Sequence, residues 1–256
     1  MKLSKTLGIA TTAALVVAAA GAMNSTVSSG SMGDTVGNIT GKVVFDGERP
    51  KPKPLTITGE QSKGCCPEGV QMDTTDHGLL IDEEGGIANA VITIKIKDKS
   101  PEVPEKAFEL DQSKCRFDPH VMVIPVGSKV SYLNSDTLSH NIHTYAIKND
   151  GLNKTVTGGT SAEQTFKKAE TVKVTCDIHP WMSSFIVVTD ASAWAKTGAD
   201  GTFTIEGLPP GDYKFSIWHE TLGKAKGTAT INADGTSEAV EIKMGKKKKK
   251  GRKRPR

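Results

Sequence analysis

The segment from Cys176 to Met182 (CDIHPWM) carries three side chains that bind soft metals. His179 and Met182 follow Cys176 at steps of three residues, so a tight loop can turn all three toward one point. A thiolate, an imidazole and a thioether together suit copper that cycles between Cu(I) and Cu(II). Zinc is a weaker match, because a thioether is a poor zinc ligand. The segment predicts a copper site that still needs a histidine from elsewhere in the fold.

Short runs of alternating apolar and polar residues are the elements that must position this loop. One run leads directly into Cys176, and Val, Ile and Thr recur in the others. The 26 Gly and 12 Pro residues indicate many turns, and no long segment beyond the N-terminus has helical periodicity. These patterns predict an all-β protein. The clearest predicted strands are 37–47, which ends in a turn, and 79–81, 90–96, 121–124, 129–134, 163–166, 171–175 and 184–189.

A set of motifs upstream of the loop resembles the cupredoxins, the family of blue copper proteins. The resemblance covers residues 117–189 and is closest to the amicyanin-like and plastocyanin-like members, with their Greek-key β-sandwich. The short spacing from Cys176 to Met182 fits amicyanin best. The motifs, in chain order, are Phe117-x-Pro119, Val126-Gly127, Val130, Asn134-Ser135-Asp136, His140-Asn141-Ile142-His143 and Cys176-x-x-His179-Pro180-Trp181-Met182.

The resemblance implies one type 1 copper ion with His140, Cys176, His179 and Met182 as its ligands. The alternative is a cupredoxin fold that has lost its metal, but all four ligand types are present. His143 competes with His140 for the fourth position. The two lie three residues apart on a predicted strand, so they point to opposite faces and only one can reach the metal. Family position favours His140.

Three neighbours of the ligands have expected supporting roles. By resemblance, Asn141 supplies hydrogen bonds that hold the ligand loops together. Pro180 has no N–H, so it cannot donate a backbone hydrogen bond to the thiolate. The resemblance also implies that an edge of His179 approaches the surface, where Pro180 and Trp181 form an apolar docking patch. Plain packing over the copper is an equal alternative for Trp181.

With Cys176 assigned to copper, Cys65, Cys66 and Cys115 remain. Three cysteines allow one disulfide and leave one thiol. We expect Cys115 to pair with either Cys65 or Cys66, which would tie the N-terminal segment to the copper domain. The alternatives are a strained bridge between Cys65 and Cys66, or a second metal site built from Cys65, Cys66 and His77. Neither His120 nor His219 is assigned to a metal from the sequence.

A second β module is expected after residue 190. Residues 199–217 resemble the carboxypeptidase regulatory-like (transthyretin-like) β-sandwich, through the run DGTFTIEGLPPGDY. The segment GNITGKVVFDG, which begins at Gly37, resembles the first strand of the same family. The second, smaller sandwich is therefore either discontinuous, with the copper domain inserted into it, or a separate module.

Both ends of the chain differ in composition from its body. Lys2, Lys5, an apolar run and the small residues Ala20-Gly21-Ala22 indicate a cleaved export signal. An uncleaved anchor is the alternative, but the apolar run is short for a membrane span. Residues 246–256 carry nine basic side chains and no acid, whereas residues 23–245 carry a net charge of −7. Such a tail cannot pack. It either binds anionic lipid, polysaccharide or an acidic partner, or it is a disordered end with no defined partner; no specific nucleic acid is expected.

These observations predict an exported blue copper protein of the periplasm or cell surface. It would carry single electrons between a donor and an acceptor redox protein, and would not be an enzyme. The alternatives are copper storage or delivery, and a surface-binding β protein in which copper is secondary. The expected organisation is signal peptide 1–22, flexible leader 23–36, N-terminal β segment 37–106, cupredoxin domain 107–190, regulatory-like module 191–244 and basic tail 245–256.

Overall fold

The computed structural model describes residues 35–51, 54–57, 62–66 and 68–245 of the 256-residue chain. All of these described residues belong to one compact unit. The predicted signal peptide, the predicted leader up to residue 34 and residues 246–256 of the predicted basic tail lie outside the described residues.

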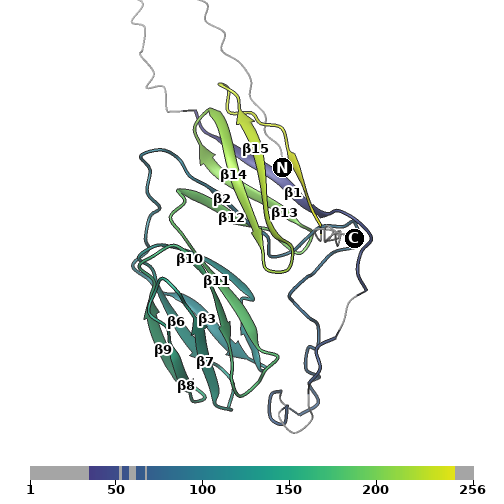
Figure 1. Cartoon of the computed structure of the whole chain (residues 1–256), viewed down its shortest axis with the longest axis vertical. Helices are drawn as coiled ribbons and strands as arrows, with labels where there is room; N and C mark the ends of the chain where they lie inside the picture. Colours follow the sequence, from purple (N-terminus) through teal and green to yellow (C-terminus); the bar gives the residue numbers. More distant parts are fainter. Residues whose placement is uncertain (1–34, 52–53, 58–61, 67, 246–256) are drawn as a thin grey trace, which may run out of the picture. The chain divides into compact units, whose positions relative to one another are not determined.

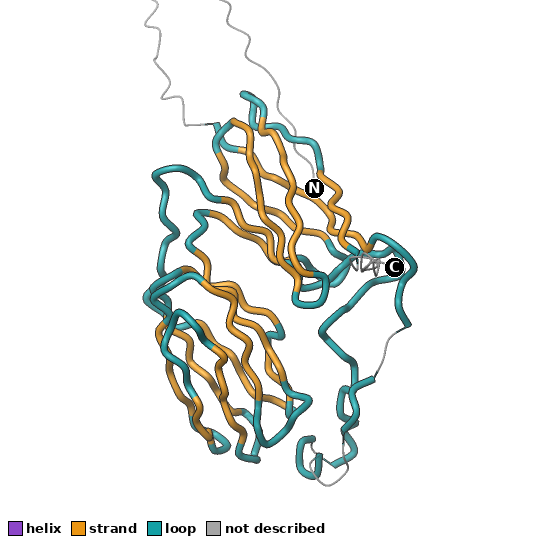
Figure 2. The backbone as a smooth tube through the Cα atoms, in the orientation of Figure 1, coloured by secondary structure: helices purple, strands orange, loops and turns teal. Residues whose placement is uncertain are grey.

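The described part of the chain is built from strands and contains no helix (Figure 2). Accordingly, no helix within it has the length and apolarity to span a membrane. The all-β prediction is confirmed. Within the described residues, sixteen strands form four sheets, which pair into two β-sandwiches, each around its own hydrophobic core.

The first sandwich contains the middle of the chain. Its five-stranded sheet has the order β5-β11-β10-β7-β8, and its four-stranded sheet has the order β4-β3-β6-β9. Its strands are β3 (Phe108–Ser113), β4 (Arg116–Asp118), β5 (Val121–Pro125), β6 (Lys129–Asn134), β7 (His140–Tyr145), β8 (Asn153–Val156), β9 (Ser161–Thr165), β10 (Glu170–Thr175) and β11 (Ser183–Thr189).

Alternation along these strands produces the first core. In β6 the side chains of Val130 and Tyr132 are fully buried, while Lys129, the first residue of the strand, is exposed. In β10 the alternate residues Val172 and Val174 are likewise fully buried. Because successive side chains of a strand point to opposite faces, each strand presents one apolar row to the facing sheet.

The second sandwich is discontinuous. Strands from before the first sandwich share its sheets with strands from after it, in the orders β13-β1-β16 and β12-β2-β14-β15. In Figure 1, β1 lies beside the green and yellow strands of the C-terminal part of the chain. Its strands are β1 (Gly37–Phe45), β2 (Val91–Ile94), β12 (Ala193–Lys196), β13 (Thr202–Leu208), β14 (Gly211–His219), β15 (Gly223–Ile231) and β16 (Val240–Met244).

Pairing across the insertion decides between the two arrangements left open by the sequence. β1 pairs antiparallel with β13 and parallel with β16, and β2 pairs antiparallel with both β12 and β14. Ile39 and Ile92, from the N-terminal segment, are fully buried in the same core as Phe215. The first sandwich is therefore an insertion between β2 and β12.

Candidate metal centre

Three strands of the five-stranded sheet bring the predicted ligands to one end of the first sandwich. His140 is the first residue of β7, Cys176 directly follows β10, and Met182 directly precedes β11. β10 lies between β7 and β11, and its last residue, Thr175, is paired with His143 on one side and with Ser183 on the other. The start of β7, which carries His140, and the loop from Cys176 to Met182 therefore lie at the same end of the sheet.

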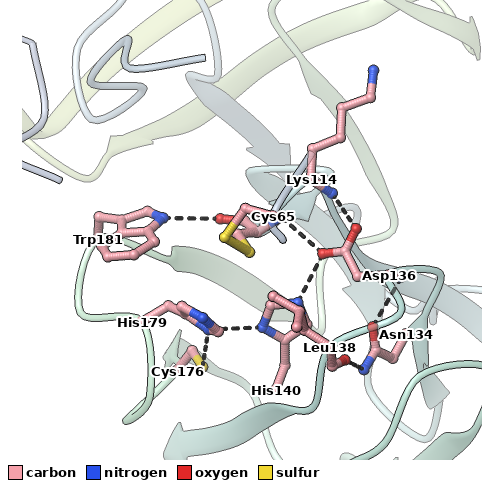
Figure 3. The surroundings of a disulfide bond; sticks show 10 residues. Cys65, Lys114, Asn134, Asp136, Leu138, His140, Cys176, His179 and Trp181 are labelled. Carbon is pink, nitrogen blue, oxygen red and sulfur yellow. Dashed lines mark hydrogen bonds and ion pairs between the residues drawn. A yellow bond between two sulfur atoms is a disulfide. The ribbon is translucent and has the colours of Figure 1, made fainter. Parts of the chain in front are cut away.

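His140, Cys176 and His179 form a tight buried group. Their ligand atoms all lie within 4.8 Å of one another, and the side chains are 0%, 2% and 4% exposed. The Nδ1 atoms of the two imidazoles are 2.9 Å apart, and the Cys176 Sγ atom is 3.7 Å from Nδ1 of His179 (Figure 3). His140 and His179 are 39 residues apart in the sequence, whereas Cys176 and His179 belong to one short loop. The strand pairing brings the distant histidine next to that loop.

The loop that carries three of the four predicted ligands is closed by its own backbone. The N–H of Met182 donates to the carbonyl of His179 at 2.9 Å, and the N–H of Cys176 donates to the carbonyl of Met182 at 3.3 Å. The Met182 side chain is fully buried in the core that also contains Cys176. The steps of three in the sequence therefore correspond to a compact turn, in which the side chains of Cys176, His179 and Met182 are all buried.

Asp136 holds the ring of His140 from the side opposite the thiol. Its Oδ2 atom lies 2.8 Å from Nε2 of His140, and the Asp136 carboxylate also accepts hydrogen bonds from the backbone N–H groups of Lys114 and Cys115 at 2.6 and 2.8 Å (Figure 3). Lys114 and Cys115 have φ angles of 52° and 51°, a conformation that points their N–H groups at the carboxylate. A carboxylate behind a metal-binding histidine fixes both its tautomer and its orientation.

Sequence reasoning did not assign a role to Asp136. The residue was present in the Asn134-Ser135-Asp136 motif, four positions before His140. The side chain of Asn134 shapes this connection by donating to the carbonyl of Leu138 and accepting from the N–H of Asp136, at 2.8 and 3.1 Å. The motif could have suggested the role, because it bends the chain so that Asp136 faces the histidine that follows.

Asn141 links the two ligand-bearing segments. Its backbone N–H donates to Cys176 Sγ at 3.3 Å, and its side-chain carbonyl accepts from the N–H of Asp177 at 3.2 Å. Its amide nitrogen donates to Oδ1 of Asn153 at 2.7 Å. These bonds give Asn141 the loop-holding contacts that its predicted role requires.

The electrostatics of the group favour a thiolate. Burial raises the pKa of the Cys176 thiol, but hydrogen bonds with the His140 ring and the backbone N–H of Asn141 lower it by more. Burial lowers the pKa of His140, but its hydrogen bonds with Asp136 and Cys176 outweigh this and raise the pKa to about 9. Because the thiolate is the form that binds metal, the surroundings prepare Cys176 to act as a ligand.

His179 and Trp181 differ from the exposed arrangement that the resemblance implied. His179 is only 4% exposed and Trp181 only 9%, whereas Pro180 between them is exposed. The indole Nε1 of Trp181 donates to the backbone carbonyl of Cys115 at 3.1 Å, and its ring lies 5.2 Å from that of His179. The expectation of a surface edge on His179 is therefore wrong for this chain, and Trp181 packs over the site rather than forming a docking patch.

The cover over His179 includes a disulfide between Cys65 and Cys115. The sequence left Cys65 and Cys66 open as partners of Cys115; Cys65 forms the bond, and Cys66 is a partly exposed free thiol. The alternative metal site of Cys65, Cys66 and His77 is wrong, because Cys65 is consumed in the disulfide. His77 instead pairs with Asp73, with Nε2 to Oδ2 at 3.0 Å.

The remaining histidines lie outside this group. His143 points away from it: Nδ1 is 3.0 Å from Oδ1 of Asp177, and the ring stacks on Tyr145 with 4.3 Å between centroids. His120 has its Nδ1 atom 3.1 Å from the carbonyl oxygen of Ser183. His219 is buried and accepts a hydrogen bond at Nδ1 from the N–H of Thr221 at 3.2 Å.

The donor set fits copper better than other metals. Two imidazoles and one thiol form a buried group, and Met182 lies at the end of the loop that carries Cys176 and His179. Two histidines and a cysteine with a weak axial methionine is the set that type 1 copper uses. A hard cation would require oxygen ligands, which this group does not provide.

A comparison with known protein families identifies the first sandwich. Residues 104–189 match the family of copper-binding proteins described as plastocyanin/azurin. Over this segment the chain is similar to the cupredoxins. The match supports a copper cofactor, and proteins of this family are copper-binding electron-transfer proteins. The matched segment contains the entire candidate site except Cys65, so the cupredoxin domain and the metal centre coincide.

Three copper proteins are among the solved structures to which part of the chain is similar. A purple cupredoxin from Nitrosopumilus maritimus is 22% identical, covering 32% of this chain and 99% of its own, with a TM-score of 0.29. A reduced single-substitution variant of amicyanin is 26% identical, covering 38% and 98%, with a TM-score of 0.31. A copper-containing nitrite reductase from Thermus scotoductus SA-01 is 23% identical, covering 38% of this chain but 25% of its own, with a TM-score of 0.31. No curated protein matches the chain significantly.

Proposed function

We propose that this protein is an exported carrier of single electrons, whose cupredoxin domain holds one type 1 copper ion through His140, Cys176, His179 and Met182. The observation that carries the proposal is the buried group of two imidazoles and a thiol, with their ligand atoms within 4.8 Å of one another. Copper bound there supplies a one-electron couple between Cu(I) and Cu(II).

The residues around the ligands favour electron transfer over metal exchange. Asp136 holds the His140 ring, Asn141 holds the loop beside Cys176, and the loop closes through the carbonyl of Met182. Ligands fixed in this way rearrange little when the charge of the site changes. Burial also excludes water from the site, so the role that we propose is carriage of electrons rather than catalysis.

Export is supported by the disulfide. A Cys65–Cys115 bond forms and persists in oxidising compartments such as the periplasm or the cell surface. The N-terminal residues 1–22 have the composition of an export signal. We therefore place the carrier outside the cytoplasm, with a donor and an acceptor that are themselves extracytoplasmic redox proteins.

The second sandwich and the tail would serve attachment. The run from Asp200 to Tyr213 resembles the carboxypeptidase regulatory-like family of β-sandwiches. None of the four proposed copper ligands lies in this second sandwich. The nine basic side chains of residues 246–256 would be drawn to anionic lipid, polysaccharide or an acidic partner. In this proposal these parts hold the copper domain near its redox partners.

Spectroscopy of the copper-loaded protein tests the proposal. The Cu(II) form should be intensely blue, show the electron paramagnetic resonance of type 1 copper, and bleach on reduction. Cys176→Ser should lose the colour, whereas Cys66→Ser is the matched control and should keep it, since Cys66 lies outside the ligand group. A colourless, redox-inactive copper complex of the wild-type protein would overturn the proposed function.

A further inference from the structure

The disulfide lies directly against a proposed copper ligand. The sulfur atoms of Cys65 and Cys115 and a ring nitrogen of His179 lie within 4.8 Å of one another, and all three side chains are buried (Figure 3). Cys115 also lies within the same distance of the ligand atoms of Asp136 and His140. Two further sulfur atoms therefore adjoin the metal centre on its His179 side.

The position of Cys115 does not depend on the disulfide alone. Its N–H donates to Asp136 at 2.8 Å, and its carbonyl accepts from the indole of Trp181 at 3.1 Å. Cys65 has a backbone bond of its own, from its N–H to the carbonyl of Ser62 at 3.1 Å. Cleavage of the S–S bond would leave these contacts in place, so at least the Cys115 thiol would stay beside His179.

We propose that the reduced Cys65–Cys115 pair, with His179, forms a second copper site that takes Cu(I). Thiolates select Cu(I) over harder metals. In the disulfide form the two sulfur atoms are bonded to each other and lack the thiolate charge, so the second site exists only after reduction. The inference rests on the proposed function in one respect: it assumes that copper reaches this protein.

The chemistry balances with a dithiol as reductant. The dithiol gives two electrons and two protons to the S–S bond, which becomes two thiols, and is itself converted to a disulfide. Cu(I) then replaces the thiol protons of Cys65 and Cys115, which pass to solvent, and its own oxidation state does not change.

His179 connects the proposed second site to the type 1 site. His179 belongs both to the group with Cys65 and Cys115 and to the group with His140 and Cys176. A Cu(I) ion captured by the two thiolates could therefore move to the type 1 ligands by ligand exchange around His179. The reduced pair would act as an entry site for copper, and the disulfide as the closed form that keeps the loaded site dry.

Counting Cu(I) in the full chain tests the inference independently of electron transfer. Cys176→Ser removes the type 1 thiolate, so that the cysteine pair can be measured without it. Cu(I) is titrated against a chromogenic Cu(I) chelator, before and after reduction with dithiothreitol and removal of the reductant. The reduced protein should hold one more tightly bound Cu(I) ion per chain than the oxidised protein.

Matched variants in the same background identify the ligands. Cys65→Ser and Cys115→Ser should each abolish the additional Cu(I), and Cys66→Ser should retain it. Near-UV circular dichroism of each variant checks that the domain is folded. If Cys115→Ser unfolds, the comparison of Cys65→Ser with Cys66→Ser decides the matter, because both sit on the same loop.

Equal Cu(I) counts in the oxidised and reduced protein would overturn the inference, as would loss of the additional ion in Cys66→Ser alone. Failure of the proposed function looks different. In that case the wild-type protein with Cys176 intact would not turn blue with Cu(II), whatever the count of Cu(I) at the cysteine pair.

Discussion

The carboxylate of Asp136 lies 2.8 Å from Nε2 of His140, the atom opposite the Nδ1 that faces His179 and the thiol group. The same carboxylate accepts the backbone N–H of Cys115, whose sulfur is bonded to Cys65. One partly buried acid therefore links a proposed copper ligand to the disulfide that covers the site.

Asp136→Asn should weaken copper binding by about 10- to 100-fold, the range found when a carboxylate behind a metal-binding histidine is changed. The amide would still reach His140 but carries no charge to hold the ring proton. Competition with a chelator measures the affinity. Glu163→Gln, an exposed acid paired with Lys129 at 3.2 Å, is the control and should bind copper like the wild type. Unchanged affinity in Asp136→Asn would show that the contact is only structural.

His140→Ala and His143→Ala form a matched pair of histidine deletions on one strand. His140 lies in the ligand group, whereas His143 contacts Asp177 and stacks on Tyr145. We expect His140→Ala to abolish the blue absorption and His143→Ala to leave it intact. The visible spectrum of each copper-loaded variant is the measurement, and loss of colour in His143→Ala alone would reverse the ligand assignment.

Trp181→Phe removes the indole N–H but keeps an aromatic ring over His179. The buried carbonyl of Cys115 then loses its donor, which should lower the free energy of unfolding of the copper domain by about 1–3 kcal/mol. Denaturant unfolding measures the change. Trp194→Phe, on β12 of the second sandwich, should leave the copper spectrum and the stability of the copper domain unaltered. Wild-type stability in Trp181→Phe would mean that the Cys115 bond contributes nothing.

Cys65→Ser removes the disulfide between Cys65 and Cys115, which are 50 positions apart in the sequence. Chain entropy arguments give a loss of about 2–4 kcal/mol in the free energy of unfolding, because the unfolded state is no longer constrained. Cys66→Ser changes the adjacent thiol and should cost less than about 0.5 kcal/mol, as most surface substitutions do. Denaturant unfolding under oxidising conditions compares the two. Equal effects would indicate that the two cysteines exchange partners in solution.

Ile39→Ala tests whether the N-terminal segment stabilises the second sandwich. Ile39 is fully buried on β1, so its truncation should cost about 2–5 kcal/mol in that sandwich. The blue absorption of the copper domain should not change at temperatures where both sandwiches are folded. Val36→Ala is the control, since Val36 is 55% exposed. Calorimetry resolves the transitions, and an unaffected Ile39→Ala protein would contradict the shared core.

Residue spacing by itself predicted the loop that carries three of the four proposed copper ligands. Cys176, His179 and Met182 are separated by steps of three within one short loop that its own backbone hydrogen bonds close, so their proximity along the chain depends only on local backbone geometry. Alternation of apolar and polar residues likewise predicted the strands, because the period of a strand is set by its own backbone. The role of His140 needed the added information of a family motif.

Tertiary structure alone decided the features that depend on distant pairing. The choice of Cys65 over Cys66, two neighbours of the same type, follows from how the N-terminal segment lies against the turn at Cys115. Burial of His179 follows from that same contact. The parallel pairing of β1 with β16 joins residues about 200 positions apart, as in Val43 with Ile242. Local patterns cannot encode such partners, because any strand edge offers the same hydrogen-bonding groups, and only the packed core selects among them.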